Sequence, residues 1–326
     1  MDFNTLHYDC IVFDAHCDAL NDVLAGTRQL GERSQLGEVD IPRLREGGVT
    51  AQIFACWVPV EFQAHSATRH ALQLVDAFYR ELEANPDTLM LALTSDDILR
   101  AKAEGRVAGI LGLEGAEALD GSIELLRIFH RLGLRNLGLA WNYRNAACDG
   151  VMVARSRGGL TPFGEKLVRE CNRLGIMIDV AHVAPVGVED VLALSEQPVI
   201  CSHANAYALC PNGRNLTDAQ IEAIAANGGV IGATFVREFI SPDSQEASLE
   251  RFLDHVDHLV KIAGVDHVGL GSDFDGLGLD GPPDGMEDVT SYPLVTAGLL
   301  TRGYDERSIR KIMGENLLRI FRSVCG

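Results

Sequence analysis

Metal-binding residue types follow several apolar stretches of this sequence. His16 and Asp18 stand two residues apart at the end of the apolar run 11–13. In an extended strand, residues i and i+2 project to the same face, so this imidazole and this carboxylate would point the same way. Such a pair is suited to hold one metal ion. A single His-x-Asp pair is a weak motif, and its meaning depends on the rest of the chain.

Four further strand-like runs end in an ionisable residue of the same kind. They are 107–113 before Glu114, 176–181 before His182, 199–202 before His203 and 268–272 before Asp273. The carboxyl ends of parallel strands meet at one face of a barrel, where its active site lies. Agreement among five strands is hard to attribute to chance.

Three histidines and two carboxylates exceed the ligand set of one catalytic zinc, which takes three protein ligands and a water. They suit two divalent cations, with zinc preferred for nitrogen and carboxylate ligands. Glu114 can bridge ions ~3.5–4 Å apart. His16 and Asp18 would then bind one ion, and His182 and His203 the other. A water between two cations is acidified enough to supply hydroxide at neutral pH.

The predicted nucleophile is therefore water, with Asp273 as the catalytic residue. Asp273 is not needed as a ligand and is placed to take a proton from that water and pass it to the leaving group. The sequence contains no G-x-S-x-G motif. Ser202 would face away from His203 on a strand, so a serine hydrolase is not expected.

Short apolar runs alternate with longer amphipathic stretches, and this pattern positions the candidate residues. The predicted strands are 11–16, 49–58, 107–113, 134–141, 176–181, 199–202, 230–235 and 267–271. The predicted helices, with apolar residues near every 3.6 positions, are 67–84, 123–132, 162–173, 185–194, 218–226, 249–263, 294–300 and 305–321. Such repeats in 326 residues predict one (β/α)₈ TIM barrel domain over residues 1–326. An open doubly wound sheet is the alternative. The long loops 142–160 and 276–285 are expected to cover the catalytic face.

Charge and cysteine usage exclude several classes of partner. The formal net charge is -18 and no basic run occurs, which argues against a nucleic-acid or membrane partner. Eight cysteines without a C-x-x-C pair are expected to be buried, reduced thiols. With neither a signal peptide nor a long apolar segment, a cytoplasmic location is expected. A homodimer is left open.

Six segments in combination carry a resemblance to a known family. They read DAHCD at 14–18, GLEG at 112–115, IDVAHV at 178–183, SH at 202–203 with RN at 214–215, GSDFDG at 271–276 and GENLLR at 314–319. Together they resemble the membrane dipeptidase (renal dipeptidase) family of the amidohydrolase superfamily, over nearly the whole chain. The resemblance implies a (β/α)₈ barrel, two zinc ions bridged by a glutamate, and hydrolysis of dipeptides, often with a D-residue at the C-terminal position. The five predicted ligands match the ligands of that family one by one.

The resemblance also implies that Arg214 binds the substrate carboxylate, since it matches the arginine with that role. A planar guanidinium holds a carboxylate through two hydrogen bonds. Without the resemblance, a surface arginine or an ion pair with Asp218 is an equal interpretation.

One stretch departs from the family. Its better-studied members carry a histidine after strand four that polarises the scissile carbonyl, whereas residues 139–145 read LAWNYRN here, with Trp141 in that place. Loss of one oxyanion donor costs ~10²–10³ in rate. Either Asn142, Arg144 or Asn145 replaces the histidine, or the substrate differs. We therefore predict Trp141 and Asn142 as substrate-binding residues, with a specificity that differs from that of the histidine-bearing relatives.

The function predicted from the sequence is a zinc-dependent dipeptidase acting on small dipeptides with a free C-terminal carboxylate, including L-Xaa-D-Xaa. A different amidohydrolase, such as one cleaving N-acyl amino acids, is the main alternative. A non-catalytic metal-binding scaffold is less consistent with an intact Asp273. Among the aromatic residues, Phe54 and Phe235 are expected in the core, whereas Trp57 and Phe274 are left open between core and pocket.

Overall fold

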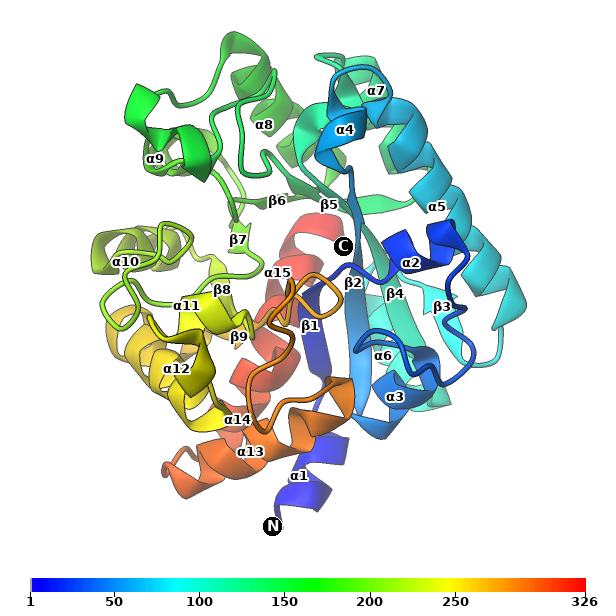
Figure 1. The fold of residues 1–326 in the computed structure, drawn as a ribbon, viewed down its shortest axis with the longest axis vertical. Coiled ribbons are helices and arrows are strands. Elements are labelled where there is room, and N and C mark those ends of the chain that lie inside the picture. Colours follow the sequence, from blue (N-terminus) through cyan, green and yellow to red (C-terminus); the bar gives the residue numbers. More distant parts are fainter. Residues whose placement is uncertain (1) are drawn as a thin grey trace.

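A closed barrel of parallel strands forms the centre of the molecule (Figure 1), as described by a computed structural model of residues 2–326. Its strands are β1 Val12–Cys17, β2 Val49–Trp57, β4 Val107–Glu114, β5 Leu134–Gly138, β6 Met177–Asp179, β7 Ile200–Cys201, β8 Val230–Ala233 and β9 Val268–Leu270. They pair in the order β2-β1-β9-β8-β7-β6-β5-β4, and a β2–β4 pairing closes the ring. The predicted (β/α)₈ barrel is thus confirmed, and the open sheet is wrong.

A ninth strand, β3 (Leu89–Leu91), lies outside the ring. It pairs with the first part of β4, from Val107 to Gly109, and β5 takes over that edge of β4 from Leu111 onward. Our strand list omitted β3, because three residues are too few to show a period. The predicted strand 134–141 ends earlier, at Gly138, so Trp141 belongs to the following loop.

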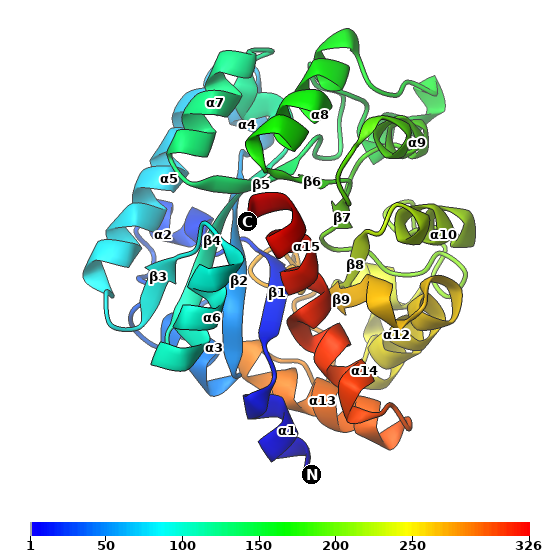
Figure 2. The same cartoon turned by 180° about the vertical axis from the view of Figure 1, so that it is seen from behind.

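Helices surround the barrel on its outside (Figures 1 and 2). They are α1 Phe3–Asp9, α2 Leu20–Ala25, α3 Ile41–Glu46, α4 Val60–Gln63, α5 Ala67–Ala84, α6 Ser95–Glu104, α7 Ile123–Arg131, α8 Pro162–Leu174, α9 Pro185–Leu194, α10 Asp218–Ala226, α11 Arg237–Ile240, α12 Leu249–Ala263, α13 Tyr292–Thr301, α14 Glu306–Arg310 and α15 Asn316–Cys325. Short 3₁₀ turns occur at Ala116–Leu119, Val151–Ser156, Ser244–Glu246, Val265–His267 and Val289–Ser291. No helix within residues 2–326 is long and apolar enough to span a bilayer.

Capping residues explain why several helices begin where the sequence predicts. At α10, Thr217 and Gln220 form a reciprocal capping box, which satisfies two orphan N–H groups. At α8, Thr161 caps the N-terminus, Pro162 occupies the first turn and Gly175 ends the helix in a left-handed conformation. The predicted bounds of α5, α9, α10 and α12 match the structure.

Two apolar cores hold these layers together. The larger one lies between the strands and the helices around them. The second contains Phe13, Ile53 and Ile110 of the strands together with Leu317 and Phe321 of α15, so the last helix packs against strand side chains of this core. Figure 2, the view from behind, shows α15 in front of the barrel, beside β1 and β9.

The predicted helix 305–321 is interrupted by a π-helical turn, Lys311–Glu315. Gly314 in this turn touches strand β1, since an added Cβ would lie 2.3 Å from the carbonyl oxygen of Ile11 and 2.7 Å from the amide of Phe13. Only glycine allows this approach, and the wider turn lets α15 reach the barrel.

Candidate metal centre and active site

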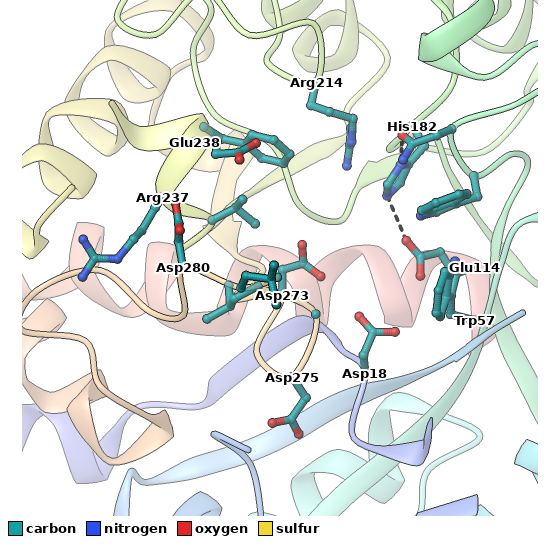
Figure 3. A pocket seen from close by; sticks show the side chains of 18 of the residues that line it. Asp18, Trp57, Glu114, His182, Arg214, Arg237, Glu238, Asp273, Asp275 and Asp280 are labelled. Atoms are coloured by element: carbon teal, nitrogen blue, oxygen red, sulfur yellow. Dashed lines mark hydrogen bonds and ion pairs between the residues drawn. The ribbon is translucent and has the colours of Figure 1, made fainter. Parts of the chain in front are cut away.

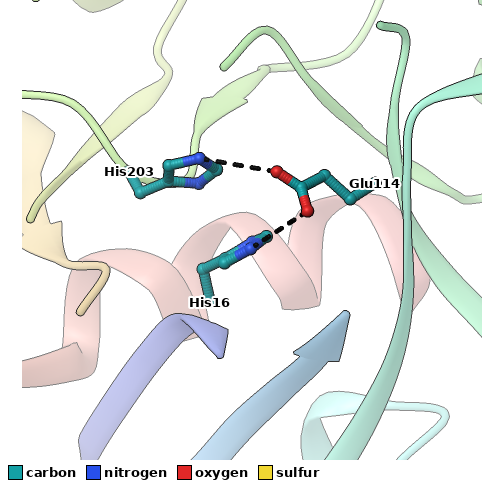
Figure 4. Close-up of side chains that lie close together, drawn as sticks. All are labelled: His16, Glu114 and His203. Carbon is teal, nitrogen blue, oxygen red and sulfur yellow. Dashed lines mark ion pairs between the residues drawn. The ribbon is translucent and has the colours of Figure 1, made fainter. Parts of the chain in front are cut away.

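The predicted ligands meet at the carboxyl ends of the strands. They are His16 and Asp18 at the end of β1, Glu114 at the end of β4, His182 after β6 and His203 after β7, joined by the predicted proton carrier Asp273 after β9. All six side chains are buried. Figures 3 and 4 show parts of this cluster.

His16 is surrounded by three carboxylates. Its Nε2 lies 3.4 Å from Asp18 Oδ2, 3.6 Å from Glu114 Oε2 and 3.7 Å from Asp273 Oδ1. Three buried carboxylates around one imidazole leave an excess of negative charge, which is costly unless cations compensate it.

Glu114 directs its second oxygen toward the other two histidines. Glu114 Oε1 lies 2.8 Å from His182 Nε2 and 3.8 Å from His203 Nε2, and these two nitrogens are 2.8 Å apart. Figure 4 shows the glutamate between His16 and His203, with one oxygen toward each. One oxygen therefore faces each half of the cluster, as a bridging carboxylate requires.

The donor set fits divalent cations. His16 Nε2 and Asp18 Oδ1 are buried without a hydrogen-bond partner. Two groups of donor atoms each lie within 4.8 Å of one another, namely His16 with Glu114 and His203, and His16 with Asp18 and Asp273. Unpartnered buried donors and excess negative charge are together suited to divalent cation binding.

Two histidines are neutral at pH 7, as metal ligation requires. Burial, aided by the charge of Arg214, lowers the pKa of His182 to about 4. Burial also lowers the pKa of His203 well below its usual value, helped by His16 and His182. Their ring nitrogens are then free to donate lone pairs.

The pKa values of His16, Glu114 and Asp273 each depend on the charges of neighbouring members of the cluster. Burial opposes protonation of His16, but the charges of Glu114 and Asp18 outweigh it and raise the pKa of His16. Burial likewise opposes ionisation of Glu114, yet His16 and His182 hold the pKa of Glu114 well below its usual value. Burial raises the pKa of Asp273 well above its usual value, and Asp18 and Glu114 add to the effect while His16 opposes it. Asp273 is thus the carboxyl group best able to hold a proton.

Two neighbouring side chains orient the histidines. Asn142 Oδ1 lies 2.9 Å from His182 Nδ1, and Ser202 Oγ lies 2.8 Å from His203 Nδ1. When Nδ1 donates to such a partner, Nε2 keeps its lone pair for a metal. Our expectation that Ser202 faces away from His203 is wrong: β7 ends at Cys201, so strand alternation no longer governs these two residues.

Replacing Asn142 by leucine is expected to weaken metal affinity about 10- to 100-fold, because the His182 ring loses the acceptor that fixes its orientation. Titration of the metal-free protein with Zn²⁺ would measure this. Asn142→Asp, which retains the acceptor oxygen, is the matched control and should bind far more tightly than the leucine variant. Equal affinities for all three proteins would show that Asn142 does not position His182.

Two buried aspartates tie neighbouring strand ends together. Asp14 Oδ1 accepts hydrogen bonds from the Ser272 amide at 2.8 Å and the His16 amide at 3.3 Å. Asp179 Oδ1 accepts from the Ser202 amide at 2.9 Å and the Ala181 amide at 3.0 Å. The first links the ends of β1 and β9, and the second links β6 and β7, so each aspartate fixes the spacing of two candidate site residues.

The backbone is strained where the chemistry is placed. His182 and Asp273 adopt left-handed conformations, with φ of 65° and 62°. Non-glycine residues rarely do so, and such strain concentrates at functional sites. Gly276 lies so close that an added Cβ would be 2.3 Å from Asp18 Oδ2 and 2.7 Å from Asp273 Oδ1.

A cavity of about 610 Å³ opens above the cluster (Figure 3). Its walls include all three predicted substrate-binding residues, Arg214, Trp141 and Asn142, and part of the loop 276–285. This volume is in the range of small-molecule sites. The two long loops thus border the candidate active site, as expected.

Among residues 2–326, Arg214 has no carboxylate within ion-pair distance. Its Nη2 donates to the His203 carbonyl at 3.3 Å, its guanidinium lies 5.4 Å from the centre of the Phe239 ring, and its buried Nε has no hydrogen-bond partner. Burial lowers the pKa of Arg214. The alternative ion pair with Asp218 is absent, since Asp218 bonds to His258 at 2.7 Å.

The aromatic residues divide between core and cavity. Phe54, Phe235 and Phe274 are fully buried, and the last two rings pack 5.2 Å apart, so Phe274 belongs to the core. Trp57 lines the cavity beside Trp141, with ring centroids 5.3 Å apart. Sequence reasoning left Trp57 open, and its place at the end of a barrel strand was the available signal.

A (β/α)₈ barrel with a buried His and carboxylate cluster at its strand ends defines a metal-dependent hydrolase. Residues 1–325 match the family described as Membrane dipeptidase (Peptidase family M19). The chain belongs to this family.

Known relatives extend over most of the chain. Dipeptidase tcpJ of Claviceps purpurea (strain 20.1) is 37% identical over 297 residues, which are 88% of this chain and 69% of that protein. Dipeptidase 3 of Mus musculus is 36% identical over 293 residues, 88% of this chain but only 58% of that protein, less than two thirds of its length. A metallo peptidase from Rhodobacter sphaeroides, crystallised with a phosphinate mimic of the dipeptide L-Ala-D-Ala, is 34% identical with a TM-score of 0.89, covering 97% of this chain and 100% of that one.

Proposed function

We propose that this protein is a zinc-dependent dipeptidase that cleaves dipeptides with a free C-terminal carboxylate, including those of the L-Xaa-D-Xaa type. The observation that carries the proposal is a half-buried arginine, with no carboxylate partner among the described residues and with a buried Nε that has no hydrogen-bond partner, lining the same cavity as a cluster of metal-binding side chains. The Rhodobacter sphaeroides structure with its L-Ala-D-Ala mimic supports the substrate class.

Each part of the site has a role in this proposal. When bound by His16, Asp18, Glu114, His182 and His203, two divalent cations supply an acidified water and polarise the scissile carbonyl. Arg214 holds the substrate carboxylate and so places the peptide bond over the cluster. Asp273 accepts a proton from the water and delivers it to the leaving amine.

The metal requirement is tested by measuring the metal content of the protein and by removing the metal with a chelator. Protein reconstituted with Zn²⁺ and freed of excess metal is expected to hold two ions per chain, and chelation is expected to abolish hydrolysis reversibly. Elemental analysis alongside activity measures both. One ion per fully active chain would contradict the binuclear centre, because a single cation would then be sufficient for catalysis.

Substrate class is tested with L,L-dipeptides, L,D-dipeptides and N-acyl amino acids of matched side chains. Faster turnover of the dipeptides, with L,D-compounds among the substrates, is expected. A preference for N-acyl amino acids would favour the other amidohydrolase, and two bound metals without turnover of any compound would favour the scaffold.

We also propose that the chain acts in the cytoplasm as one barrel domain. All eight cysteines have free thiols, which supports a reducing compartment. A homodimer stays a prediction.

A further inference from the structure

The chain has only two tryptophans, and both line the active-site cavity. Trp57 ends strand β2, and Trp141 follows β5 in the adjoining loop. Their rings lie 5.3 Å apart at an interplanar angle of 57°, and Trp141 also lies 6.1 Å from the His182 ring and 5.8 Å from the Tyr143 ring. Trp57, Trp141 and His182 line the cavity, so their rings form one aromatic wall.

The strand order places Trp57 opposite Arg214 across the barrel mouth, with Trp141, after β5, between them. Between β7 and β2 the ring contains β8, β9 and β1 in one direction, and β6, β5 and β4 in the other. Arg214 is anchored to the end of β7 through its bond to the His203 carbonyl, whereas Trp57 ends β2 in register with Glu114 of β4. In Figure 3 Arg214 and Trp57 approach the cavity from different sides, with Glu114 next to Trp57.

These positions fix the direction of a bound dipeptide, if Arg214 binds its carboxylate as proposed above. An extended residue spans about 3.3–3.6 Å, so the scissile carbonyl lies over the cluster and the N-terminal residue lies beyond it. That residue then reaches the aromatic wall. The C-terminal side chain stays on the Arg214 side.

Trp57 also offers an unused hydrogen-bond donor. Its indole Nε1 is buried and has no hydrogen-bond partner in the described part of the chain. Buried donors usually bind something, so this N–H is available to an acceptor on the ligand, such as its scissile carbonyl. The ring faces and this donor lie in the same cavity.

We propose that Trp57 and Trp141 form the subsite for the N-terminal side chain of the substrate, and that this subsite selects aromatic side chains. A third ring would pack against two indoles in edge or offset geometry. The inference rests on the dipeptidase function and names the substrate class more narrowly. It assigns a specificity role to Trp57, which the sequence left open.

The test uses the zinc-loaded full chain and the substrates Gly-D-Ala, L-Leu-D-Ala, L-Lys-D-Ala and L-Phe-D-Ala. The unmodified enzyme is expected to have a kcat/KM for L-Phe-D-Ala at least ~10-fold above that for Gly-D-Ala, the usual scale of discrimination by an apolar pocket. Trp57→Ala should reduce this ratio to near one. Trp57→Phe keeps a ring but no donor, so it should preserve most of the ratio while lowering kcat/KM for every substrate. Phe62→Ala, which removes an exposed ring outside the cavity lining, is the control and should keep the ratio.

Fluorescence gives a second readout that needs no turnover. Trp57→Phe leaves Trp141 as the only tryptophan, and Trp141→Phe leaves Trp57. A phosphinate analogue of L-Phe-D-Ala should change the emission of both single-tryptophan proteins more than the Gly-D-Ala analogue does. An unchanged emission in either protein would overturn the subsite.

Different outcomes test the aromatic subsite and the proposed dipeptidase function on which it rests. Turnover of all four dipeptides at similar kcat/KM, or a preference for the lysyl substrate, would overturn the aromatic subsite and leave the dipeptidase intact. Absence of turnover with every dipeptide would overturn the proposed function itself.

Discussion

Asp273→Asn is expected to lower kcat by a factor on the order of 10² or more while both cations stay bound. The amide is nearly the same size but cannot accept and return a proton, and general acid-base catalysis is worth ~10²–10⁴. Asp273 suits this task because burial among carboxylates raises its pKa, and because its left-handed backbone holds the side chain over the cluster. Steady-state kinetics with metal analysis of the same samples measures the effect.

The matched control is Asp280→Asn, which removes an exposed carboxylate at the rim of the same cavity and should leave kcat within about twofold. Loss of one metal in the Asp273 variant would instead identify Asp273 as a ligand, consistent with its grouping near His16 and Asp18. Near-normal turnover with two metals would show that another group carries the proton.

Arg214→Met should lower kcat/KM for a dipeptide with a free carboxylate by ~2–5 kcal/mol, the cost of leaving a desolvated charge without its partner. The unmodified enzyme should discriminate strongly against C-terminally amidated dipeptides, and the variant should lose this preference. Methionine fills a similar space, so the cavity keeps its shape.

Arg214→Lys is the matched control, because it retains a charge but lacks the planar fork. Its kcat/KM for the free acid should fall between that of the unmodified enzyme and that of Arg214→Met. Comparison of each dipeptide with its amide, at equal concentration, measures the discrimination. Equal hydrolysis of both by the unmodified enzyme would exclude carboxylate recognition and favour a broader amidohydrolase.

The barrel and its cluster were predictable because both leave local marks in the sequence. Most barrel strands are dominated by apolar residues, and Glu114, His182 and Asp273 stand directly after such runs. A closed ring then brings these ends together whatever the details of packing. Helix α5 was likewise predictable, since its apolar face repeats every 3.6 residues and Asn85-Pro86 ends it.

Other features depend on contacts between distant segments, which no local pattern records. The bond of Asn142 to His182 joins two loops, and the contact of Ser202 with His203 appears only because β7 is two residues long. Trp57 could be placed at a strand end, but its free N–H and its distance from Trp141 required coordinates. Strand β3 was missed because three residues cannot establish a period.

The hydrogen bonds that Ser272 donates to Asp14 affect the order in which the molecule can fold. They span 258 residues of sequence, and β1 pairs with β9 alone on that side of the ring. During synthesis, a nascent chain that has not yet emerged beyond Ser272 cannot close the sheet, and His16 and Asp18 lack their neighbour Asp273. Contacts between residues so far apart in the sequence also slow folding, since a long loop must close before they form. The closed ring, with Asp273 beside His16 and Asp18, is therefore completed late in the life of the chain, after the segment that carries the five predicted ligands has been made.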